Sequence, residues 1–197
     1  MERKTLRYIL FIFGLLIFSF GISFGNRSLL GGNPMAVFVV GLSKHLPLSV
    51  GTCNLIVAVV EVIIGFVLDR KNVTLATVFG MVFGSYMIDF ANLFILETDS
   101  LIIRIIFMIC GILCYCLGLS LQQYAHVGLG NLDCLNFGLM KAFNVEKYHT
   151  VKWITDAAFL IAGYLLGGVV NVGTVLLLLM AGVIIEQLRK VLKKIFG

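Results

Sequence analysis

The sequence predicts an all-α integral membrane protein with about six transmembrane helices, arranged as two inverted three-helix repeats. Three observations predict this fold class: the composition, a series of apolar segments of membrane-spanning length, and an internal repeat of 97 residues. Apolar residues make up 60% of the 197 residues and charged residues only 13%, against roughly 25% charged residues in an ordinary soluble domain. This composition excludes a water-soluble fold.

The apolar segments are long enough to cross a bilayer. A spanning helix needs about 20 mostly apolar residues, because each residue rises roughly 1.5 Å through a hydrocarbon core about 30 Å thick. Such segments occupy residues 7–25, 51–69, 73–94, 101–121, 150–168 and 171–189. The first is too long for a signal-peptide core and no small-residue cleavage site closes it, so we expect it to stay as a helix. We interpret residues 1–197 as a single integral membrane domain.

The basic residues predict the orientation of these spans. With a cytoplasmic N-terminus, 12 of the 15 Lys and Arg residues fall on the cytoplasmic side, leaving only Arg27, Lys44 and Arg104 outside. An excess of Lys and Arg in cytoplasmic loops is the usual pattern. We therefore expect a multi-pass protein of the cytoplasmic (inner) membrane with both termini cytoplasmic. The net charge of +5 reflects this topology, and we expect no nucleic-acid partner.

The repeat appears when the chain is aligned with itself at a shift of 97 residues. Gly14 then matches Gly111, Gly21 matches Gly118, and Ser23 matches Ser120, with no gap through the later spans. Repeat 1 covers about 1–97 and repeat 2 about 98–197. Because each repeat holds three spans, the second enters the membrane from the opposite side. Inverted repeats recur in secondary transporters, whose sites lie near the midplane between the repeats. The glycines, spaced by seven, fit close helix packing.

A short helix is predicted after the first span of each repeat. Gly31-Gly32-Asn33-Pro34 leads into residues 34–46, and Gly128-Leu129-Gly130-Asn131 leads into residues 132–143. A Gly-rich turn followed by Asn and Pro is typical of a helix start. These helices are too short to span, so each is either re-entrant or lies at a membrane interface. If re-entrant, their N-termini would meet near mid-membrane and offer unpaired N–H groups to a solute.

Polar residues at membrane depth are the candidate site residues, because burying them in a bilayer is costly. Lys152 and Asp156 are four residues apart and can pair within one helix, for structural or functional reasons. Glu61 has no cation within helical reach, which makes it a candidate for proton coupling. Asparagines also join helices in membranes, which is the structural alternative for them. The candidate substrate-binding residues are Asn33, Pro34, Asn54, Glu61, Asn131, Asp133, Asn136, Lys152 and Asp156.

The two short-helix segments and the last span carry a resemblance to a known family. Three segments match the motifs of this family. They are Leu30-Gly31-Gly32-Asn33-Pro34 with Gly41-Leu42, residues 128–133 with Gly138-Leu139, and the glycine-rich stretch 167–174. The chain resembles, almost end to end, the YczE/YyaS/YitT-type small bacterial membrane proteins, most closely the YczE branch. It departs from their pattern at Ala36, at Asn131 and at Lys152 with Asp156. The resemblance implies a polytopic membrane protein and no particular substrate.

The function classes follow from what the sequence contains. It has no phosphate-binding loop, metal-ligand cluster or nucleophile elbow, so we expect no enzymatic activity, no metal and no cofactor. The leading hypothesis is a transporter or channel for a small molecule or ion, with its site between the repeats. The alternative is a membrane interaction protein: a regulator, a helper or a substrate-binding subunit of a larger complex. The expected partner is the lipid bilayer, and both a homodimer and a membrane-complex partner are compatible with this chain.

Overall fold

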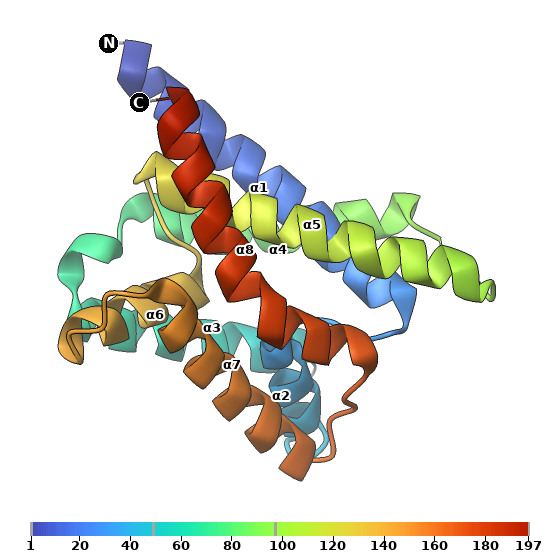
Figure 1. The fold of residues 1–197 in the computed structure, drawn as a ribbon. Coiled ribbons are helices and arrows are strands. Elements are labelled where there is room, and N and C mark those ends of the chain that lie inside the picture. The colour runs from blue at the N-terminus through green and yellow to red at the C-terminus, as the bar shows by residue number, and fades with distance from the viewer. Residues whose placement is uncertain (1, 49, 97, 197) are drawn as a thin grey trace.

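The fold is helical, as predicted. The computed structural model describes residues 2–48, 50–96 and 98–196, with the side chains of all of these except 2, 3, 50, 51, 85 and 89. The helices in this part of the chain are α1 (Glu2–Ser28), α2 (Pro34–Ser43), α3 (Val50–Leu68), the short 3-10 helix η1 (Arg70–Asn72), α4 (Leu75–Phe94), α5 (Leu101–Ala125), α6 (Asn131–Ala142), α7 (Tyr148–Leu165) and α8 (Val172–Phe196). Figure 1 shows their arrangement.

The helices have the lengths and surfaces of a membrane protein. Within the described ranges, three helices are long and apolar enough to cross a bilayer: Lys4–Ser28, Leu75–Phe94 and Leu101–Ala125. Pro34–Ser43 and Thr52–Leu68 are shorter apolar helices. Large apolar side chains such as Leu75, Leu93 and Leu165 are exposed over the outside of the bundle. An apolar surface of this extent requires a lipid environment. The number of six spans stays a prediction.

The pair α1 and α5 lies between α4 and α8, and the two helices run antiparallel (Figure 1). The rings of Phe18 and Tyr115 lie 5.3 Å apart, and those of Phe24 and Phe107 5.5 Å apart. Glycine allows their backbones to touch: a Cβ on Gly118 would lie 2.5 Å from the backbone nitrogen of Phe18. The equivalent atom on Gly21 would lie 2.4 Å from the backbone nitrogen of Tyr115. The predicted role of these glycines in helix packing is confirmed.

Two further helices pack on this central pair in the same way. α4 lies along α1, where the Ser23 hydroxyl donates to the carbonyl oxygen of Ile88 at 3.1 Å. α8 lies along α5, where the Ser120 hydroxyl donates to the carbonyl oxygen of Ile185 at 3.3 Å. Each serine and each acceptor differs from its counterpart by 97 residues. The contact between a first and a last helix therefore recurs in both parts of the chain.

The short helices α2 and α6 are exchanged between the two parts of the chain. α2 packs on α7, where a Cβ on Gly163 would lie 2.5 Å from the backbone nitrogen of Phe38. α6 packs on α3, where a Cβ on Gly65 would lie 2.7 Å from the carbonyl carbon of Cys134. The helices have 10 and 12 residues, which confirms that both are short, and α2 ends at Ser43, three residues before the predicted end. The short helix of each part of the chain thus packs against a helix of the other part.

The two termini lie at the same end of the bundle (Figure 1). Leu10 near the start of α1 and Leu192 near the end of α8 belong to one apolar cluster with Leu121 of α5. The rings of Tyr124 and Phe196 lie 6.0 Å apart at this end.

Replacing Gly118 by alanine should lower the melting temperature of the purified protein in detergent, because the new methyl group overlaps the backbone of Phe18. Replacing Gly25 by alanine is the matched control, since nothing lies within 4 Å of a Cβ there. Alanine favours a helix over glycine by roughly 1 kcal/mol, so the control should melt at the same or a higher temperature. Equal melting temperatures for the two variants would contradict the close contact of α1 and α5.

Candidate functional site

The N-termini of the two short helices meet inside the bundle. Asn33 caps α2: its side-chain oxygen accepts a hydrogen bond from the backbone nitrogen of Met35 at 3.1 Å, and Pro34 occupies the first turn. Asn131 begins α6, and its amide nitrogen lies 4.0 Å from the sulfur of Met35. The first turns of α2 and α6 are therefore in contact, with their helix dipoles pointing toward the same region.

A cavity of about 770 Å³ adjoins this meeting point. Its volume falls within the roughly 300–1,000 Å³ of small-molecule sites. Most of its wall is apolar, and the described residues that line it include no charged side chain. The predicted site residues Asn33, Asn54 and Asn131 line it. Sequence reasoning missed its other polar groups, which are Asn26, Tyr86 and Tyr115.

Glu61 lies behind the cavity wall on α3. It is 2% exposed, and the amide nitrogen of Asn131 donates a hydrogen bond to its Oε2 atom. Its other oxygen, Oε1, has no hydrogen-bond partner among the described residues. Because Asn131 lines the cavity and also contacts Glu61, one side chain connects the cavity to a buried carboxyl group.

Lys152 and Asp156 form the predicted ion pair within α7. Their charged atoms lie 2.8 Å apart and each side chain is 1% exposed, which confirms the expected i, i+4 pairing. The ammonium group of Lys152 lies 5.7 Å from the centre of the Tyr115 ring, which lines the cavity. A cation over an aromatic ring at this distance is attracted to it. The ion pair is thus separated from the cavity by one ring.

Asp133 is held on α6 by two side chains that the sequence did not indicate. Its Oδ1 atom accepts a hydrogen bond from the Tyr148 hydroxyl at 2.5 Å, and its Oδ2 atom accepts one from the Gln123 amide at 3.0 Å. One turn along α6, the side-chain oxygen of Asn136 accepts a hydrogen bond from the Thr155 hydroxyl at 2.8 Å. Gln123 and Tyr148 lie at predicted span ends, where polar residues are ordinary.

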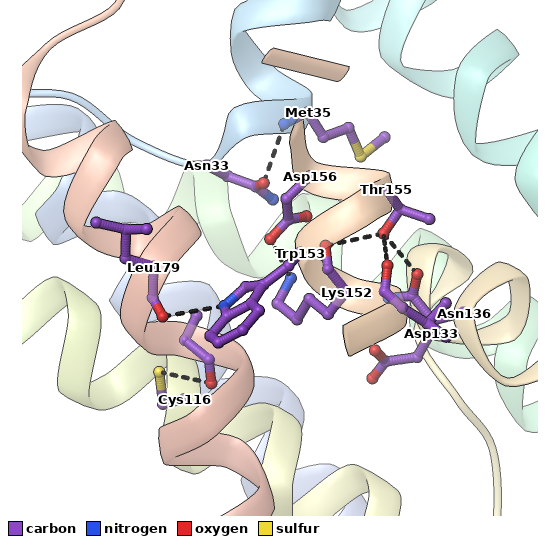
Figure 2. Close-up of polar contacts among 12 residues, drawn as sticks. Asn33, Met35, Cys116, Asp133, Asn136, Lys152, Trp153, Thr155, Asp156 and Leu179 are labelled. Atoms are coloured by element: carbon purple, nitrogen blue, oxygen red, sulfur yellow. Dashed lines mark hydrogen bonds and ion pairs between the residues drawn. The ribbon is translucent and has the colours of Figure 1, made fainter. Parts of the chain in front are cut away.

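Glu61, Asp133, Asp156 and Lys152 form one buried ionic cluster. The Lys152 ammonium pairs with Asp156 at 2.8 Å, and Glu61 and Asp133 are 2% and 3% exposed. Figure 2 shows Lys152 and Asp156 on one turn, with Asp133 and Asn136 on the neighbouring helix. Unpaired charges are costly to bury, and this cluster holds three acids and one base. Bound protons would balance it.

The structure therefore divides the predicted site residues into two groups. Asn33, Asn54 and Asn131 line the cavity, whereas the remaining residues lie behind its wall or beside it. Pro34 is buried in the first turn of α2 and serves the helix start. The buried group, connected to the cavity through Asn131 and Tyr115, comprises Glu61, Asp133, Asn136, Lys152 and Asp156.

Comparison with known proteins identifies relatives over almost the whole chain. A family described as "Family of unknown function (DUF6198)" matches residues 5–190. An uncharacterized protein of Haemophilus influenzae is 26% identical over 187 residues, 94% of this chain and 83% of the relative. The uncharacterized protein YyaS of Bacillus subtilis is 24% identical over 194 residues, 97% of this chain and 96% of the relative.

The uncharacterized membrane protein YczE of Bacillus subtilis is 26% identical over 191 residues, 94% of this chain and 86% of the relative. These similarities confirm the expected resemblance to YczE and YyaS. No solved structure matches the chain.

Replacing Lys152 by methionine, or Asp156 by asparagine, should each destabilise the protein by about 3–5 kcal/mol, because each leaves an uncompensated buried charge. The double variant Lys152→Met/Asp156→Leu removes both charges, so its free energy of unfolding should fall by less than that of either single variant. Unfolding of the purified protein in detergent measures all three.

The pair of Asp69 and Lys141, 2.8 Å apart and with the Lys141 side chain 59% exposed, provides the control. Lys141→Met should change stability by less than about 1 kcal/mol, as expected for an ion pair that is open to solvent. A double variant less stable than both single variants would contradict the interpretation of Lys152 and Asp156 as a coupled buried pair.

Proposed function

We propose that this chain, which belongs to the DUF6198 family of unknown function, carries a small solute across the membrane without chemical conversion. The single observation that carries the proposal is the cavity of about 770 Å³ at the meeting point of the two short-helix N-termini. Helix N-termini that meet inside a membrane protein form solute sites in secondary transporters. The apolar wall with amide groups favours an uncharged or internally neutral solute.

The arrangement of the helices supports an inverted-repeat architecture. α2 and α6 begin 97 residues apart, and so do α4 and α8. α1 and α5 correspond under the same shift and run antiparallel, as inversion of the second repeat requires. We infer that repeats 1–97 and 98–197 have opposite orientations, with α2 and α6 re-entrant and the cavity between the repeats.

The buried ionic cluster supports coupling to a cation or proton. Ionisable groups inside a membrane protein are commonly part of a substrate or ion pathway, because they are expensive to retain otherwise. Asn131 touches both the cavity and Glu61, so solute binding and the charge state of the cluster act on the same side chain. Glu61 is the proposed coupling residue.

We also propose that both termini are cytoplasmic, so that the cavity opens toward the outer face. The cavity is lined by Phe18 to Asn26 of α1, the half of that helix far from the N-terminus. Protease cleavage of tags placed at each terminus should occur in inside-out vesicles and fail in intact spheroplasts. Cleavage of either tag in spheroplasts would contradict this topology.

Transport is tested with the purified protein in liposomes, by measuring binding and flux over a panel of neutral metabolites, zwitterions and ions. Once a solute is found, Asn54→Ala should weaken its binding by roughly tenfold, as expected for one lost hydrogen bond in a desolvated site. Ala36→Phe, which fills the cavity, should abolish binding. Val67→Phe adds the same ring to the exposed face of α3 and is the control.

A folded protein that binds and carries nothing across this panel would overturn the transport proposal. A stoichiometric partner recovered in mild detergent, together with absent flux, would instead favour a subunit or regulator of a larger membrane complex.

A further inference from the structure

The two halves of the molecule differ in conformation at equivalent positions. Asn54 and Leu55 of α3 line the cavity, and Leu55 is 56% exposed. The residues 97 positions later, Val151 and Lys152 of α7, are only 5% and 1% exposed. The same helix surface is therefore open in the first half and covered in the second.

Side chains of α7 next to this covered surface contact α8. The Trp153 indole nitrogen donates a hydrogen bond to the carbonyl oxygen of Leu179 at 3.0 Å. The His149 Nδ1 atom lies 2.6 Å from the Glu186 Oε2 atom, and Lys190 approaches the other oxygen of Glu186 at 3.5 Å. The contacts of Glu186 lie in the half of α8 near its C-terminus, the end where both chain termini lie, whereas Leu179 lies in the other half of α8.

The first half has no equivalent of the indole contact. The positions 97 residues before Trp153 and Leu179 are Ile56 and Val82. Isoleucine has no side-chain hydrogen-bond donor, and Val82 lines the open cavity. The cavity is therefore open next to α3 and α4, whereas the equivalent region next to α7 and α8 is closed.

We propose that the contact between α7 and α8 is a gate, whose opening exposes Val151, Lys152 and Thr155 as the wall of a second cavity on the terminus-bearing side. This inference rests on the proposed transport function. By the same equivalence, α3 and α4 approach one another when α7 and α8 separate, which closes the first cavity. The two arrangements expose the region between the repeats to opposite sides of the membrane in turn.

The second cavity differs from the first in its chemistry. Amide and apolar groups line the open cavity, whereas the covered surface of α7 carries Lys152, with Asp156 one turn further along the helix. Water reaches this ion pair only when α7 and α8 separate. Exchange of a proton with Lys152 and Asp156 is therefore confined to the terminus-bearing side, while the solute enters from the other.

The experiment compares labelling of two matched cysteines by a membrane-impermeant maleimide in right-side-out and inside-out vesicles. Asn54→Cys reports on the open cavity and Val151→Cys on the covered surface, at positions 97 residues apart. Mass spectrometry of the labelled peptides resolves each introduced cysteine from the five native ones. No solute is needed.

The gate is weakened by the double substitution Trp153→Phe/Glu186→Gln, which removes the indole donor and the charge facing His149. Losing one hydrogen bond to a charged group shifts an equilibrium by roughly tenfold or more. We expect labelling of Val151→Cys from the terminus-bearing side to rise by at least about that factor. Labelling of Asn54→Cys from the opposite side should fall. Tyr164→Phe, which removes an exposed hydroxyl from α7, should change neither.

A rise at Val151→Cys without a fall at Asn54→Cys would overturn the proposal, because it indicates local loosening of α7. Unchanged labelling at both positions in a folded variant would overturn it as well. A second measurement uses Ile56→Cys/Val82→Cys with an otherwise intact gate and again with the weakened gate. Oxidation to a disulfide should be faster with the weakened gate, and equal rates would contradict the closing of α3 on α4.

Failure of the gate and failure of transport are distinguishable. Reciprocal labelling in a protein that carries no solute would support the gate and contradict the transport function. Solute binding without reciprocal labelling would support the transport function and contradict the gate.

Discussion

The backbone contact between α1 and α5 is the constraint on which the rest of the bundle depends. Glycines at the crossing let the two helices approach until a side chain of any size would overlap a backbone atom of the partner. α4 and α8 then pack on the outer sides of this pair through matching serine contacts. Close antiparallel packing of equivalent helices makes the contact self-complementary, as in a symmetric dimer. The short helices pack across the two halves, α2 on α7 and α6 on α3.

Much of this fold can be predicted from the sequence, because the positions of the helices depend on local sequence patterns. Apolar length indicates the helices, the Asn-Pro step indicates the start of α2, and the four-residue spacing indicates the ion pair of α7. The contacts between helices cannot be predicted from such local patterns. Glu61 meets Asn131 across 70 positions, and His149 meets Glu186 across 37. A helical pattern predicts which face is buried and leaves the neighbouring helix undetermined.

The candidate site shows the same division. Amides in glycine-rich segments were recognisable as helix starts, so the cavity residues Asn33 and Asn131 could be predicted. Tyr115 and Tyr148 could not, since an aromatic residue in an apolar helix is ordinary core composition. Their roles appear only when the helices pack, because one ring then separates Lys152 from the cavity and the other hydroxyl binds Asp133. Buried charge is expensive in lipid, which explains why so many neutral donors surround so few ions.

The exchange of α2 and α6 between the halves also bears on how the chain is made. During synthesis α2 leaves the ribosome long before α7, the helix against which it packs. Its packing surface must therefore wait for the second half of the chain. α6 emerges after α3 and finds its packing partner already in place. The early half therefore depends on the late half to complete its insertion, and an interrupted chain would expose an unfinished surface for membrane quality control to recognise.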